Sequence, residues 1–131
     1  MLNFTFAELC KSETAEKYKV NNIPPSIEVQ DNLLALITKV LQPLRNKLKC
    51  PIKVTSGYRC SFVNQMVGGV LTSQHMTGEA ADIKVAKMSV TKLFETIKNS
   101  DIEYDQLINE HNQWVHVSYS RKKNRKQAFK L

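Results

Sequence analysis

Apolar side chains recur at spacings of three and four residues after a double proline, Pro24-Pro25. The series is Leu33, Ile37, Val40, Leu41, Leu44 and Leu48. This spacing predicts an amphipathic helix over residues 26–49, with a kink or restart at Pro43 because proline interrupts the helical hydrogen bonds. Upstream, Thr5 and Ser12 are positioned to cap two short helices. The stripe is typical of core packing, so we assign it no catalytic role.

Shorter elements alternate in the rest of the chain. The sequence predicts strands over 52–55, 80–85, 104–109 and 114–120, and helices over 61–67 and after Ser89. The last two strands are separated by residues of turn composition, Glu110-His111-Asn112-Gln113, which predicts a hairpin. We therefore expect an α+β fold, with helices packed on a small, mainly antiparallel sheet. The length of 131 residues suits a single domain over 1–131.

The last predicted strand has two chemically different faces. Because side chains two residues apart in a strand point the same way, Trp114, His116 and Ser118 share one face, and Val115 and Val117 share the other. The valine face is expected to pack into the core. The His116 face can then meet a neighbouring strand.

Residues 73–82, Ser-Gln-His-Met-Thr-Gly-Glu-Ala-Ala-Asp, contain side chains that could bind a metal together with His116. They place His75 and Asp82 seven positions apart, and all four glycines of the chain lie in or just before this stretch. His, Asp and His are a ligand set for a catalytic zinc ion that keeps a fourth position for water. The sequence thus predicts one zinc ion held by His75, Asp82 and His116 at the sheet face.

The net charge indicates which partners the protein could bind, and the cysteine content indicates the state of its thiols. The net charge is +7, and a basic tail begins at about residue 121. Such a tail favours nucleic acid, anionic lipid or an acidic cell-wall polymer, or is a solvated and partly frayed end. The three cysteines are an odd number without close spacing, which indicates buried free thiols. We expect neither a signal peptide nor a membrane span, and therefore synthesis in the cytoplasm.

Several segments together resemble the family of zinc D-Ala-D-Ala carboxypeptidases, which includes L-alanyl-D-glutamate endopeptidases of bacteriophage lysins. The family's metal motif, S-x-H-x-x-G-x-A-x-D, is matched at every fixed position between Ser73 and Asp82. The other matching segments are Ser56-Gly57-Tyr58-Arg59-Cys60, Val63-Asn64, Val67-Gly68-Gly69 and Trp114-Val115-His116-Val117-Ser118. The resemblance implies that His75, Asp82 and His116 bind zinc and that Arg59 and Ser73 bind substrate.

The chain departs from this family at the general base. Several relatives carry an acidic residue three positions before the last zinc ligand, where this chain has Gln113. An amide cannot accept the proton, so we take Glu110 as the catalytic base, with Asp105 as the next carboxylate back along the chain. Arg59 as a surface ion pair and Glu110 as a plain turn residue are the alternatives.

The resemblance implies a zinc metallopeptidase that hydrolyses peptide bonds of bacterial peptidoglycan, of carboxypeptidase or endopeptidase type. A phage or prophage endolysin, monomeric and acting on the wall after release, fits the size and charge. Its partners would be peptidoglycan peptides, with no specific nucleic acid. A non-catalytic zinc-containing module on the same fold is one alternative. A nucleic-acid-binding protein is another, suggested by the basic tail but without a recognisable motif.

Overall fold

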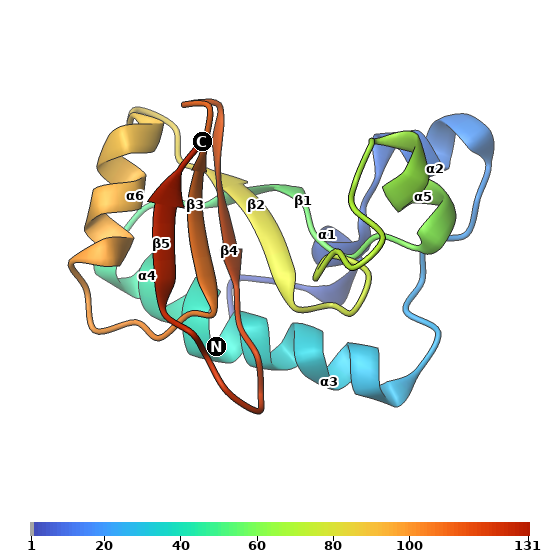
Figure 1. Ribbon diagram of the computed structural model, residues 1–131, viewed down its shortest axis with the longest axis horizontal. Helices are drawn as coiled ribbons and strands as arrows, with labels where there is room; N and C mark the ends of the chain where they lie inside the picture. The colour runs from blue at the N-terminus through green and yellow to red at the C-terminus, as the bar shows by residue number, and fades with distance from the viewer. Residues whose placement is uncertain (1) are drawn as a thin grey trace.

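The computed structural model describes residues 2–131 as helices packed on a five-stranded sheet (Figure 1). The α+β prediction is confirmed. The helical elements are α1 (Phe6–Cys10), α2 (Glu13–Tyr18), α3 (Ile27–Leu36), η1 (Ile37–Leu41), α4 (Gln42–Leu48), α5 (Ser61–Met66) and α6 (Val90–Lys98). The strands are β1 (Lys53–Ser56), β2 (Ala80–Lys84), β3 (Gln106–Glu110), β4 (Trp114–Ser118) and β5 (Gln127–Lys130).

Hydroxyl side chains fix where four of the helices begin. Thr5, Ser12, Ser26 and Ser89 each accept a hydrogen bond from the backbone N–H three residues further on, at 3.0–3.3 Å. Each bond satisfies an N–H group that has no partner inside the helix. These caps place the helix starts where the sequence predicted them.

The long predicted helix forms as one continuous rod made of α3, η1 and α4. Its irregularity lies just before Pro43, where the N–H of Gln42 bonds to the carbonyl of Ile37 and the chain makes a π turn. A proline ring clashes with the carbonyl four residues earlier in a regular helix, and the wider turn accommodates that clash. The predicted kink is therefore a π-helical segment within an unbroken rod.

The strand order is β1-β2-β4-β3-β5, with every pair antiparallel except β3 and β5. The alternation of side chains divides the sheet into two faces. One face, with Val115, Val117 and Leu107 fully buried, belongs to the hydrophobic core together with the apolar stripe of the long helix. In Figure 1 the strands pass in front of this rod, and α6 lies at the opposite end of the molecule from α2 and α5. The second face is left for polar side chains.

The C-terminal segment returns to the sheet, which the sequence did not predict. Gln127–Lys130 form β5, an edge strand parallel to β3. Before it, the Arg121 Nε donates to the Asn32 Oδ1 at 2.7 Å. The alternative of a frayed C-terminal end is therefore wrong for residues 127–130. In residues 2–131 no helix is long and apolar enough to span a membrane. The three cysteines are free thiols, half-buried rather than buried.

Candidate metal centre

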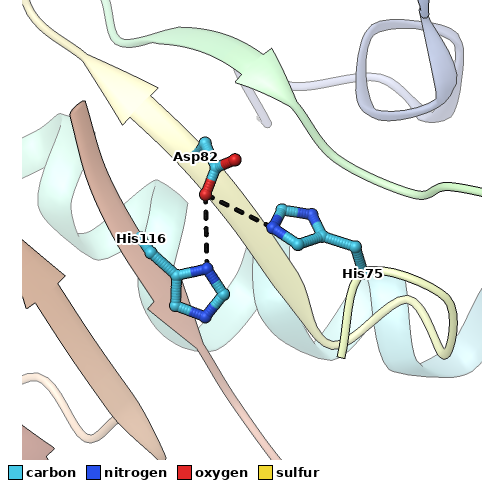
Figure 2. Close-up of side chains that lie close together, drawn as sticks. All are labelled: His75, Asp82 and His116. Atoms are coloured by element: carbon cyan, nitrogen blue, oxygen red, sulfur yellow. Dashed lines mark hydrogen bonds and ion pairs between the residues drawn. The ribbon is translucent and has the colours of Figure 1, made fainter. Parts of the chain in front are cut away.

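Three side chains from separate parts of the chain converge on the polar face of the sheet (Figure 2). Asp82 of β2 is the cross-strand partner of His116 of β4, and His75 comes from the loop before β2. The Asp82 Oδ1 lies 3.3 Å from the His75 Nε2 and 3.3 Å from the His116 Nδ1. The structure thus brings together all three residues that the sequence selected as metal ligands.

The spacing and surroundings of these atoms fit a zinc ion. All three potential ligand atoms lie within 4.8 Å of one another. Four ligands placed tetrahedrally at 2.0–2.1 Å from zinc are separated by about 3.3 Å, which matches the two observed nitrogen-to-oxygen distances. Two imidazoles and one carboxylate leave one tetrahedral position for water or substrate. The site therefore has the donor set of a catalytic zinc centre rather than of a closed structural one.

His75 is oriented by a backbone carbonyl. Its Nδ1 lies 2.7 Å from the carbonyl oxygen of Gly57, so this nitrogen carries the proton and Nε2 presents a lone pair to the site. Gly57 is needed there because a Cβ would collide with the carbonyl oxygen of Leu9, which also accepts the N–H of Tyr58 at 2.7 Å. The turn after β1 is thus fixed to α1 and in turn fixes the ring of His75.

Asp82 connects the ligand cluster to Arg59. Its Oδ1 faces the two histidines, and its Oδ2 accepts a hydrogen bond from the Arg59 Nη2 at 3.2 Å. Burial acts to raise the pKa of Asp82, but the interactions with the imidazoles of His116 and His75 outweigh it and hold that pKa below its ordinary value. Asp82 is therefore an ionised carboxylate, the form that binds a metal.

Arg59 is clamped in place rather than exposed. Its Nε donates to the Ser56 Oγ at 3.0 Å and its Nη1 to the Asn64 Oδ1 at 3.3 Å, and its side chain is only 14% exposed. Burial lowers the pKa of Arg59, while Asp82 and Glu110 act in the opposite direction. A guanidinium stays charged under such a shift. Arg59 does form an ion pair, but with Asp82 of the ligand cluster and with little exposure, rather than on the open surface.

A cavity of about 610 Å³ opens over this cluster, and the other predicted site residues also line it. Glu110 of β3 and Trp114 of β4 are cross-strand partners, two residues along the strands from the Ile108–His116 pair and on the same face. Glu110 shares the cavity without belonging to the group of possible ligands. The same wall includes Arg59 and Ser73.

The next carboxylate considered as a base, Asp105, is bound by other side chains, and the turn residues after β3 do not line the cavity. Both oxygens of Asp105 are engaged: Oδ1 accepts from the Arg125 Nε at 3.0 Å, and Oδ2 accepts from the Arg125 Nη2 at 2.7 Å and the Gln74 Nε2 at 2.9 Å. Gln113 lies in the turn after β3 and lines a neighbouring groove. His111 is an exposed turn residue, as expected.

Sequence reasoning included Asn64 in a matching segment but assigned it no role. Asn64 is 2% exposed, accepts from Arg59 and donates to the carbonyl of Val70 at 2.8 Å. It thereby ties the guanidinium to the loop that borders the cavity. The available signal was a polar residue next to Val63 on the buried side of a short helix.

Known proteins agree with this geometry. A family model described as peptidase M15 matches residues 2–118. The chain belongs to the peptidase M15 family. The family predicted from the motifs is confirmed.

A curated relative shows how far this likeness extends. The M15 chain is 34% identical to the zinc D-Ala-D-Ala carboxypeptidase of Streptomyces albus G over 101 residues, which cover 75% of this chain and 37% of the relative. It therefore spans little more than a third of that relative's length.

Proposed function

We propose that this M15 peptidase is a zinc enzyme that hydrolyses peptide bonds in bacterial cell-wall peptidoglycan. The observation that carries the proposal is the convergence of His75, Asp82 and His116 inside a cavity that also presents Arg59 and Glu110. The peptidoglycan substrate is supported by the relative, whose name is that of a carboxypeptidase for D-Ala-D-Ala. The basic net charge of +7 also suits an anionic wall polymer.

The side chains divide the chemistry among them. His75, Asp82 and His116 would hold the zinc ion, which would supply Lewis acidity toward the scissile carbonyl and toward water. The carboxylate of Glu110 takes the proton of the attacking water and delivers it to the leaving amine. Arg59 faces the developing negative charge with a guanidinium whose position is fixed before substrate arrives. The Ser73 hydroxyl hydrogen-bonds the bound peptide.

The shape of the cleft favours an endopeptidase. A second groove of about 1220 Å³ lies beside the cavity, and both are lined by Arg59, Asp82 and Trp114. Because both hollows are bordered by Asp82, a peptide that occupies the cavity could continue into the groove on the other side of the bond to be cut. Such an enzyme would act on the wall after release from the cell, as an endolysin of a phage or prophage does.

The test is digestion of purified murein followed by mass spectrometry of the released peptides. The proposal expects new peptide termini with wild-type protein, and none with His116→Ala or after removal of metal by a chelator. Products that lack only a terminal D-Ala would reveal a carboxypeptidase instead of an endopeptidase.

A second candidate is a non-catalytic zinc-containing module, favoured by Gln113 at the position where relatives carry an acid. Zinc-loaded protein that binds murein and releases no peptide would support this candidate and overturn the proposed activity.

A further inference from the structure

The C-terminal segment adds an arginine to the cavity. The family match ends at residue 118, whereas Arg125 lies beyond it and lines the cavity together with the metal ligands. The parallel pairing of β5 with β3 carries the segment to this position. Arg125 is therefore a feature of this chain that the family match does not include.

Arg125 is held firmly although its side chain is 55% exposed. Its backbone N–H and its Nε both donate to the Asp105 Oδ1, at 2.9 and 3.0 Å, and its Nη2 donates to the Asp105 Oδ2 at 2.7 Å. Asp105 itself is only 4% exposed. Within residues 2–131 no hydrogen bond involves the Nη1 of Arg125, so one edge of a fixed guanidinium remains available to a ligand in the cavity.

An unused acceptor lies beside this donor. The amide of Gln74 donates through Nε2 to the same Asp105, but its Oε1 is buried without a hydrogen-bond partner in the described chain. A buried acceptor of this kind normally has a water or a ligand as its partner. Gln74 also lines the cavity, but this oxygen is itself shielded from solvent, so the residue acts by holding Asp105, and through it Arg125, rather than by binding a peptide.

The two ends of the cavity differ in charge. Along β3, Gln106, Ile108 and Glu110 all line it, and Ile108 is the cross-strand partner of His116. Glu110 thus stands at one end, and Gln106, the partner of Gln127 at the start of β5, stands about 7 Å from Ile108 on the other side. Arg125 belongs to that second end. The cavity therefore presents the Glu110 carboxylate, whose charge also acts on Arg59, to one side of the metal ligands and the Arg125 guanidinium to the other.

We propose that Arg125, held in place by Asp105 and Gln74, forms a recognition site for an acidic residue of the substrate peptide, so that the enzyme distinguishes a carboxylate from a carboxamide. Arg125 binds the carboxylate through its available edge. This inference rests on the proposed peptidase function. It adds to that function the chemical group of the wall peptide that determines how the peptide is placed in the cavity.

The experiment uses a set of murein stem peptides in which each carboxylate is converted in turn to a carboxamide. Turnover and, separately, equilibrium binding by calorimetry are measured for wild type, Arg125→Gln and Arg125→Lys. Lys123→Gln is the matched control, because it removes one positive charge from the same segment at a residue that does not line the cavity. Zinc content and thermal unfolding are recorded for every variant, since Asp105 also supports the loop that carries His75.

We expect one particular amidation to weaken binding and kcat/KM by about fivefold in wild type and in Lys123→Gln, a magnitude suited to a half-exposed charged pair. The same amidation should make no difference in Arg125→Gln, and Arg125→Lys should keep part of the preference because it keeps the charge without the fork. Equal binding of all peptides by wild type, or an unchanged preference in Arg125→Gln at full zinc content, overturns the inference. A binding preference without any turnover would instead overturn the proposed peptidase function and leave the recognition site standing.

Discussion

Replacing Glu110 by glutamine tests the proposed base with the smallest possible change. The substitution keeps the size of the side chain and its hydrogen-bonding capacity, and it removes only the ability to take a proton. Glu110 stands on the same face as His116, two residues beyond Ile108, the cross-strand partner of His116, and about 7 Å along the strand. At this distance it can reach a water in the cavity without being one of the ligand atoms that cluster within 4.8 Å.

The expected loss in kcat is at least about 100-fold, the lower end of what a positioned acid or base contributes. This corresponds to about 2.7 kcal/mol of transition-state stabilisation. Zinc content should remain at the wild-type level, because Glu110 is not among the ligands. The assay is release of peptide termini from murein at saturating substrate, with metal analysis on the same samples.

Glu103→Gln is the matched control, since Glu103 is an exposed carboxylate close in sequence that does not line the cavity. It should keep wild-type kcat. A Glu110→Gln enzyme of near-normal rate would refute the reasoning, because both oxygens of Asp105 are already bound by Arg125 and Gln74 and no other predicted base remains.

Three further predictions concern metal, substrate and stability. Alanine at His75 or His116 should remove most of the bound zinc in elemental analysis, and full occupancy in both variants would contradict the ligand assignment. Arg59→Lys should lower kcat/KM by tenfold or more, by about 1.4 kcal/mol, with zinc and folding intact; an unchanged value would make Arg59 structural. Hydrogen bonds from Arg125, and a smaller contribution from Gln74, lower the pKa of Asp105 from 3.8 to about 2, so Asp105→Asn should cost about 1–2 kcal/mol of unfolding free energy at pH 7, and most of the difference should be lost as the pH falls from about 4 to 2. A difference that keeps its full pH 7 size at pH 2 in chemical denaturation would exclude this ion pair as its cause.

Local patterns were sufficient to predict much of this molecule. The alternation around His116 correctly assigned Val115 and Val117 to the core and His116 to the polar face, because a half-buried strand has a strict period of two. The hydroxyl caps predicted the helix starts for an equally local reason. The three ligands could be selected because their residue types and spacing are specific to one kind of metal site.

Features that depend on distant contacts were not predictable from the sequence. β5 is short and bordered by basic residues, and it forms because β3 offers a free edge, which no local pattern reveals. The Arg125–Asp105 pair joins residues 20 positions apart, and only the folded chain shows that Asp105 supports the metal loop instead of acting as a base. The clamp of Asn64 on Arg59 depends in the same way on how α5 packs.

The most direct test of the account is a zinc titration of the metal-free protein, followed by murein turnover and by zinc content per chain. The account predicts that activity is absent without metal and rises in proportion to bound zinc, reaching its plateau at about one ion per chain. The titration of His116→Ala should produce neither tight binding nor activity. Full turnover by the metal-free wild-type protein, or a plateau of bound zinc without any peptide release, would contradict the central claim that His75, Asp82 and His116 form the zinc centre of a peptidase.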